Sequence, residues 1–185
     1  AQIEKFDSAI MMSDMSNFRQ SMANSGGITF YPQSHRHWVR PGIMLYGGSP
    51  SPNNKSTILT DAVMSFQSAI IALREVKIGE CVGYGEDWRA DKRSLVATVA
   101  VGYADGFMRR NKTGHVEINN KRYEIVGRIC MDQLFVKVDE TVSKDDDVIL
   151  FGGVISIDEV AHRLDTINYE VICSISDRVP REYIK

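Results

Sequence analysis

Two short segments of the sequence combine residue types that could do chemistry. Tyr84 stands between Gly83 and Gly85, so the backbone there can turn sharply and present the phenol ring outward. A free phenol, with a pKa of about 10, is a poor proton acceptor near neutrality, and it would need a nearby cation or hydrogen bond to act as a base. The alternative, an aromatic side chain packed on a core, is the ordinary role of a loop tyrosine.

Ser25, which is followed by two glycines, is a second candidate. Its hydroxyl and the exposed amides at the start of a helix could bind an anion, although an ordinary helix N-cap has the same composition. Other polar side chains also have ordinary explanations. Arg40 could be a charge at the end of a strand, Arg109 a solvated loop charge, and Tyr169 a core aromatic beside a helix.

Composition restricts the classes of function. The chain has 43% hydrophobic and 25% charged residues, as in folded globular proteins, and its formal net charge is -2. This balance offers no basic field for nucleic acid or an anionic membrane, and no apolar run approaches the roughly 20 residues that cross a bilayer. The three cysteines and four histidines are scattered, which favours neither disulfides nor a metal site. We therefore expect a soluble, cytoplasmic protein.

The elements that must position these residues fall into two regions. In residues 1–57, a helical pattern over 2–10 is followed by a Gly-rich turn at 24–27 and by an apolar stretch at 38–46 that favours a strand. This succession indicates the end of an α/β unit. The polar segment 47–57 is predicted to be a linker or surface loop.

Residues 58–185 have a β pattern. Val, Ile, Phe and Tyr recur in short runs separated by Gly, Asn and Asp, as in strands joined by turns. Six strands are predicted, at 65–76, 94–102, 115–118, 123–126, 133–138 and 148–151. Asn119 and Asn120 suit a tight turn between two of them. Ser156 and Glu159 form a capping-box pattern that predicts the start of a helix.

Six short segments, one of which contains Tyr84, carry a resemblance to a known enzyme family. They are residues 38–47 (WVRPGIMLYG), 82–85 (VGYG), 101–106 (VGYADG), 127–133 (GRICMDQ), 168–171 (NYEV) and 178–181 (RVPR). In this order and spacing, the sequence from about Ile3 onward resembles the C-terminal half of the bacterial alanine racemases. These are fold-type III pyridoxal-phosphate enzymes that interconvert L- and D-alanine and so supply peptidoglycan synthesis. The resemblance implies the tail of a TIM-like (β/α)8 barrel, followed by a mostly antiparallel, β-barrel-like C-terminal domain.

The resemblance implies roles for several residues of the C-terminal region. Tyr84 matches the catalytic tyrosine that removes the α-proton of L-alanine. The backbone N–H of Met131 matches one that binds the substrate carboxylate, and Tyr103 also belongs to the substrate site. Arg109 and Arg128 match residues that line the passage to the active site, where they could guide a small anionic substrate.

The resemblance also implies a site for pyridoxal 5'-phosphate. Arg40 matches the arginine that hydrogen-bonds the pyridine nitrogen of this cofactor. Because arginine stays protonated, that nitrogen must accept the hydrogen bond, and the ring becomes a weaker electron sink than a pyridinium. Ser25, Gly42, Ile43 and Tyr169 match positions that contact the cofactor phosphate.

In the family, the active sites lie at a homodimer interface, and residues matching Tyr84, Tyr103 and Met131 reach the cofactor of the other subunit. The lysine that forms the Schiff base, which is also the second base, lies in a motif that this sequence does not show. We therefore expect the chain alone to be inactive. Two alternatives remain: a serine or broad-specificity amino-acid racemase, and a non-catalytic dimerisation or binding module.

Overall fold

The structure, a computed structural model, describes residues 1–51 and 60–184, and the chain forms two compact units, residues 1–61 and 62–185. The predicted boundary between residues 57 and 58 lies outside the described residues, as does the greater part of the predicted linker at 47–57. The two units have different architectures.

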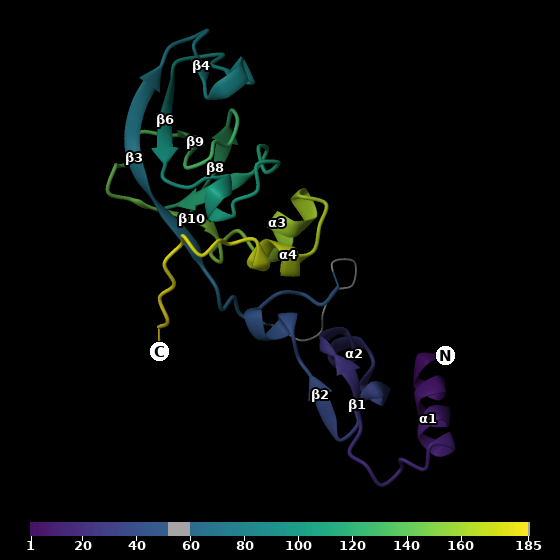
Figure 1. The fold of residues 1–185 in the computed structure, drawn as a ribbon. Coiled ribbons are helices and arrows are strands. Elements are labelled where there is room, and N and C mark those ends of the chain that lie inside the picture. The colour runs from purple at the N-terminus through teal and green to yellow at the C-terminus, as the bar shows by residue number, and fades with distance from the viewer. Residues whose placement is uncertain (52–59, 185) are drawn as a thin grey trace. The chain divides into compact units, whose positions relative to one another are not determined.

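The N-terminal unit is a small α/β arrangement around two strands (Figure 1). Its elements are α1 (Gln2–Met12), β1 (Ser21–Asn24), α2 (Ser25–Phe30), η1 (Pro32–Ser34), β2 (Trp38–Arg40) and η2 (Ile43–Tyr46), where η denotes a 3-10 helix. β1 and β2 pair in parallel, with Asn24 opposite Arg40. The residues that follow both strands therefore lie at one edge of this small sheet.

The predicted helix start at Ser25 is confirmed, since α2 begins there and the Gly-rich segment forms its first turn. The cap is Asn24, whose side chain accepts a hydrogen bond from Gly27 N at 3.0 Å. The apolar stretch at 38–46 is a strand only as far as Arg40. Pro41 follows, and because it has no N–H to continue the ladder, the chain turns into η2.

The C-terminal unit is a closed antiparallel barrel with the strand order β10-β3-β6-β9-β8-β7 (Figure 1). Its six strands are β3 (Phe66–Val76), β6 (Ser94–Val99), β7 (His115–Ile118), β8 (Lys121–Val126), β9 (Leu134–Val138) and β10 (Asp147–Phe151). The unit also contains a hairpin of β4 (Cys81–Val82) and β5 (Trp88–Arg89), the helices α3 (Ile157–Arg163) and α4 (Asn168–Cys173), and the 3-10 turns η3 (Tyr84–Glu86) and η4 (Tyr103–Asp105). The predicted fold class, an α/β part followed by an antiparallel β-barrel domain, is confirmed.

All six predicted strands form, to within a few residues of their predicted bounds. The predicted turn between β7 and β8 is also present, since Ile118 pairs with Lys121 and the two residues between them have φ angles of 52° and 61°. Positive φ at both central positions is the conformation of a tight hairpin turn, and asparagine tolerates it better than most residues.

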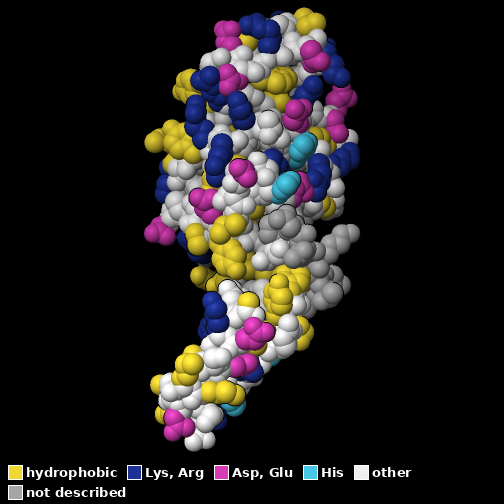
Figure 2. Space-filling model, turned by 90° about the vertical axis from the view of Figure 1, so that its right-hand side faces the viewer, with side chains coloured by type: hydrophobic (Ala, Val, Ile, Leu, Met, Phe, Trp, Pro, Cys, Tyr) yellow, Lys and Arg dark blue, Asp and Glu magenta, His cyan; other side chains and the backbone are white. Residues whose placement is uncertain are grey.

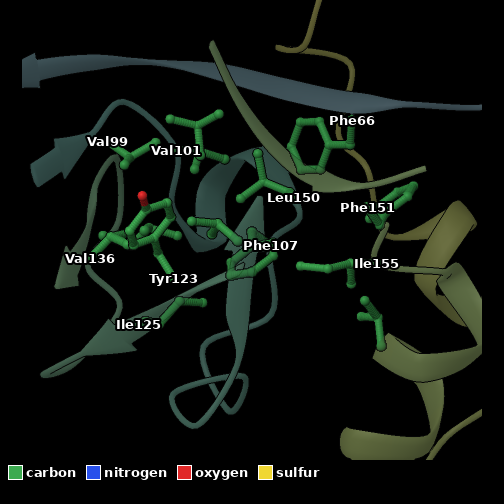
Figure 3. Packing of buried hydrophobic residues seen from close by; sticks show 14 of the residues in the cluster. Phe66, Val99, Val101, Phe107, Tyr123, Ile125, Val136, Leu150, Phe151 and Ile155 are labelled. Atoms are coloured by element: carbon green, nitrogen blue, oxygen red, sulfur yellow. The ribbon is translucent and has the colours of Figure 1, made fainter. Parts of the chain in front are cut away.

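The barrel and α3 share one hydrophobic core (Figure 3). Phe66 of β3 and Phe151 of β10 pack with their ring centroids 5.7 Å apart. Ile155, just before α3, is buried in the same cluster as Val160 of the helix and Leu164, its C-cap residue. Because alternate side chains of each strand point into the barrel, this core holds the strands and the helix together and fixes where their connecting loops begin.

One of the two hydrogen bonds of the predicted capping box forms at the N-terminus of α3, where Ser156 Oγ accepts from Glu159 N at 3.1 Å. The predicted return bond from the Glu159 side chain does not form. The carboxylate instead binds Arg122 of β8 at 2.8 Å and Arg163 at 2.9 Å. The ion pair with Arg122 connects α3 to the barrel wall in addition to the apolar packing, whereas the pair with Arg163 lies within the helix.

Charges of both signs are interspersed over the face of the C-terminal unit that Figure 2 shows. That face therefore presents no continuous basic patch of the kind that binds nucleic acid. Within residues 1–51 and 60–184, no helix is long and apolar enough to cross a bilayer.

Candidate active site

Tyr84 lies at the tip of the β4–β5 hairpin, in η3. Cys81 pairs with Arg89 and Val82 with Trp88, so the hairpin closes directly below the tip. The flanking glycines, Gly83 and Gly85, have φ angles of 77° and 73°, in the left-handed region that a residue with a side chain rarely adopts. The tyrosine is 74% exposed, and its hydroxyl makes no hydrogen bond within the described part of the chain.

Arg128 supports this turn through Asp87, which follows it directly. Its Nε donates to Asp87 Oδ2 at 2.7 Å and its Nη2 donates to Asp87 Oδ1 at 3.0 Å, so the ion pair is bidentate. A Cβ added to Gly85 would lie 2.6 Å from Arg128 Cζ, which shows how closely the guanidinium approaches the turn. The hydrogen bonds from Arg128 hold the pKa of Asp87 below its usual value, so the carboxylate stays charged and the pair stays intact at neutral pH.

Tyr103 and Met131 lie on two turns that pack directly against each other. Tyr103 N donates to Cys130 O at 3.1 Å, and Ala104 N donates to Met131 O at 3.0 Å. Gly102 allows this approach, because a Cβ there would clash with the carbonyl oxygens of Cys130 and Met131. The Met131 N–H donates no hydrogen bond within residues 1–51 and 60–184, and it is therefore available to a ligand.

These turns line a partly open cavity of about 430 Å³ in the C-terminal unit. It is lined by Tyr84, Tyr103, Arg109, Arg128, Ile129, Cys130, Met131, Asp132 and Gln133. The cavity therefore brings together five of the six site residues that the sequence predicts for this unit, and the sixth, Tyr169, does not line it. Its volume suits a small molecule, and its lining combines phenol groups, a free amide N–H and two guanidinium groups.

A second cavity, of about 810 Å³, shares Arg109 and Arg128 with the first and is also lined by Asp87, Arg110 and Lys112, together with Met108. Cations outnumber anions around it, so it attracts small anions. Cys130, which lines the smaller cavity, has its pKa raised by burial, so its thiol stays neutral near pH 7 and is a poor nucleophile.

The site residues predicted in the N-terminal unit follow the two parallel strands. Ser25 Oγ accepts a hydrogen bond from Gly42 N at 2.8 Å, which ties the start of α2 to the turn after β2. Ser25 and Ile43 are buried. Arg40 donates to Ser21 Oγ at 2.7 Å and to Met22 O at 3.3 Å, so its guanidinium lies along β1. Ser25, Gly42 and Ile43 therefore lie at the C-terminal edge of the small sheet, whereas the Arg40 guanidinium extends back to the first residues of β1.

Tyr169, the remaining predicted site residue, is the second residue of α4 and is partly exposed. It belongs to the C-terminal unit, whereas Ser25, Gly42 and Ile43 belong to the N-terminal unit.

Two family models match the chain. The model described as the alanine racemase C-terminal domain matches residues 63–183, and the one described as the alanine racemase N-terminal domain matches residues 1–50. The chain belongs to the alanine racemase family. The resemblance described from the sequence motifs is thereby confirmed.

Proteins named alanine racemase match nearly the whole of this chain. The alanine racemase of Hahella chejuensis is 38% identical over 183 residues, which are 97% of this chain and 49% of the relative. The crystal structure of the biosynthetic alanine racemase of Pseudomonas aeruginosa superposes with a TM-score of 0.88 at 37% identity, covering 100% of this chain and 52% of that one. The chain thus spans about half the length of the alanine racemases it matches.

A further alanine racemase structure, from Bartonella henselae, contains covalently bound pyridoxal phosphate. It matches with a TM-score of 0.82 at 34% identity, over 90% of this chain and 47% of that one.

The sequence analysis did not identify Asp87, Asp105 and Arg178, each of which supports a turn of the candidate site. Asp105 and Arg178 lie within the motifs 101–106 and 178–181, and Asp87 lies in none, but a motif does not indicate which side chains pair, so the sequence offered no signal for the pairing itself.

Proposed function

We propose that this chain supplies the C-terminal part of an alanine racemase, which interconverts L- and D-alanine with pyridoxal 5'-phosphate as cofactor. One observation carries the proposal: in a member of the alanine racemase family, turns far apart in the sequence bring Tyr84, Tyr103 and Met131 to one cavity. In this proposal, alanine is the substrate and D-alanine serves peptidoglycan synthesis.

Tyr84 acts as the acid–base residue in this proposal. Its Oη would take the proton from the α-carbon of L-alanine and return a proton when D-alanine reacts. The exposed tip of a rigid hairpin suits this task, because the ring is free of intramolecular hydrogen bonds while its backbone is held by the β4–β5 pairing.

Met131 binds the substrate carboxylate through its backbone N–H, which has no partner within the described residues. A free N–H in a cavity lined by Arg109 and Arg128 is a donor that an amino-acid carboxylate would satisfy. The cations around the neighbouring cavity would attract this anion toward the site. The methionine side chain itself has no role here, so the conformation of the turn matters more than the residue type.

The N-terminal unit holds donors that fit pyridoxal 5'-phosphate. The Ser25 hydroxyl accepts from Gly42 N and keeps its own proton to donate, and the Ile43 N–H makes no hydrogen bond within the described residues. Both would donate to the phosphate group. Arg40 would donate to the ring nitrogen and keep it unprotonated. When bound, the cofactor stabilises negative charge on the α-carbon of the amino acid.

Racemisation also needs a group that exchanges a proton on the face of the α-carbon opposite Tyr84. We assign that role to the family's cofactor-linking lysine, whose motif the 185 residues do not show. The 185-residue chain alone is therefore expected to have little or no racemase activity. We further propose that the complete enzyme is a homodimer in which Tyr84, Tyr103 and Met131 serve the cofactor of the other subunit.

The test is a racemase assay on the complete enzyme that contains this segment, in both directions, comparing wild type with Tyr84→Phe. Loss of the phenol hydroxyl should lower the turnover of L-alanine by roughly 100- to 10,000-fold, the usual contribution of a general base, while the absorbance of the bound cofactor persists. Tyr183→Phe is the matched control, since this exposed tyrosine lines neither cavity.

An active wild type with an unimpaired Tyr84→Phe variant would remove Tyr84 from the mechanism. A wild type that neither binds cofactor nor racemises alanine would instead leave a non-catalytic dimerisation or binding module. Comparing kcat/KM for alanine, serine and lysine separates an alanine racemase from a serine or broad-specificity enzyme.

A further inference from the structure

The segment that follows α4 packs on the turn that carries Tyr103. Ser176 N donates to Asp105 O at 3.1 Å, and Ser174 Oγ donates to Gly106 O at 2.9 Å. Gly106 has a φ of 99°, and a Cβ there would clash with the backbone of Ser174. At Gly106 the backbones of the two segments therefore pack directly against each other, with no room for a side chain between them.

Arg178 extends this contact to the neighbouring turn. Its Nη2 donates to Asp132 Oδ1 at 2.8 Å, and its Nε lies 3.4 Å from Asp105 Oδ1. The second carboxylate oxygen of Asp105 accepts from Gly102 N at 2.8 Å, so this aspartate also closes its own turn. One guanidinium thus bridges two carboxylates, one on each turn.

Both bridged turns belong to the candidate site. Asp105 ends the 3-10 turn that Tyr103 begins, and Asp132 follows Met131 and lines the same cavity as Tyr103. An unpaired carboxylate at Asp132 would repel a ligand carboxylate at the adjacent Met131 N–H. A protonated guanidinium that binds this carboxylate offsets the repulsion and also limits how far the two turns can separate.

We propose that Arg178 is a positioning residue: by bridging Asp105 and Asp132 it holds the Tyr103 turn against the Met131 turn and neutralises Asp132, so that the cavity accepts the carboxylate of the substrate. The inference rests on the proposed function, since it concerns the binding of an amino-acid substrate. It gives a role to the segment 178–181 (RVPR), in which no site residue has been named so far.

A purely structural role predicts a different outcome. Arg178 and Asp132 are each more than half exposed, and exposed ion pairs contribute little to global stability. Removing Arg178 should therefore change the site more than the fold. Because the affected interaction is substrate binding rather than proton transfer, the change should fall on KM more than on kcat.

The test uses the complete holoenzyme with Arg178→Gln, Arg178→Lys, Asp132→Asn and the double variant Arg178→Gln/Asp132→Asn. Arg178→Gln should raise KM for both alanine enantiomers by roughly tenfold, with kcat altered much less and the melting temperature unchanged. Arg178→Lys should recover part of the loss. The double variant should bind better than Arg178→Gln alone, because it no longer carries an unpaired carboxylate beside Met131.

Arg93→Gln is the matched control, because it breaks another exposed Arg–carboxylate pair, with Glu75, whose residues line neither cavity. Hydrogen–deuterium exchange gives a readout that does not depend on activity: residues 102–106 and 130–133 should exchange faster in Arg178→Gln and not in Arg93→Gln.

Three outcomes would overturn the inference while wild type is active: unchanged KM and exchange in Arg178→Gln, equal effects of Arg178→Gln and Arg93→Gln, or a KM rise that merely follows a loss of melting temperature and is not relieved by Asp132→Asn. A wild type without racemase activity overturns the proposed function instead, and the exchange experiment then still decides whether Arg178 holds the two turns together.

Discussion

The two units of the chain carry candidate site residues on very different supports. In the C-terminal unit, the turns with Tyr84, Tyr103 and Met131 project from a closed barrel with a large buried core. In the described part of the N-terminal unit, Ala23 and Ile43 are the only buried hydrophobic residues. The large hydrophobic residues exposed there are Met11, Met12, Met15, Phe18, Tyr31, Trp38, Val39, Leu45 and Tyr46.

This difference separates two ways of positioning a functional residue. The barrel fixes its turns through its own core, so the cavity of the C-terminal unit exists within that unit. Two paired strands with so little buried surface are marginally stable in water, and their site residues need apolar contacts from outside the unit to be held firmly. The N-terminal unit therefore depends on further structure in a way that the C-terminal unit does not.

Dividing the chain tests this contrast most directly. Residues 62–185 expressed alone should unfold cooperatively on heating, whereas residues 1–61 alone should show no cooperative transition, because they bury too little apolar surface to offset chain entropy. Circular dichroism melting curves of both pieces measure this. A cooperative transition in residues 1–61, or its absence in residues 62–185, would contradict the contrast.

A pair of glycine substitutions tests how tightly the turns of the barrel are packed. Gly106→Ala should destabilise the C-terminal unit by about 3 kcal/mol, because it adds a steric clash with Ser174 to the cost of a positive φ of 99°. Gly79→Ala should cost only about 1 kcal/mol, since its φ is also positive, at 84°, but a Cβ there would meet open space. Urea unfolding of both variants gives the two values.

Equal losses from the two substitutions would mean that backbone conformation alone, and not packing between the turns, limits this region. In that case the close fit between the Tyr103 turn and the segment after α4 would not be what fixes the cavity.

The sequence predicted the barrel strands well because they are long enough to show their pattern and their turns have diagnostic residues, as at Asn119 and Asn120. It missed β4 and β5, since strands of two residues have no periodicity to detect. The barrel was predicted only through the family resemblance and not from the strand pattern, because pairs such as β10 with β3 join segments that are remote in the sequence.

The site, like the fold, could be predicted where a local sequence pattern exists and not where remote segments meet. Tyr84, Tyr103 and Met131 could be named because each lies in a short motif of the family. Their supports could not be predicted, because the Arg128–Asp87 and Arg178–Asp132 hydrogen bonds join residues 41 and 46 positions apart. Such pairs depend on how the strands are ordered in the barrel. In the N-terminal unit, Asn24 replaced Ser25 as the helix cap, since two adjacent residues could both cap and the sequence did not decide between them.

The smallest expected effect concerns the charge that ties α3 to the barrel. Burial raises the pKa of Glu159, but the hydrogen bonds and charge of Arg122, together with the charge of Arg163, outweigh it and leave the pKa below its usual value. A carboxyl whose pKa is lower in the folded state stabilises the fold above its unfolded pKa, and this contribution is lost as the pH falls through the folded value. Glu159→Gln should therefore cost about 1 kcal/mol at neutral pH.

The difference between wild type and Glu159→Gln should disappear once the pH is below the lowered pKa of Glu159, because the wild-type carboxyl is then neutral as well. Urea unfolding at several pH values measures it, and Glu124→Gln, on the exposed face of β8, is the control. A difference that stays constant with pH would show that Glu159 acts through packing alone. The barrel core would then be the sole anchor of α3, and the contrast with the core-poor N-terminal unit would be sharper still.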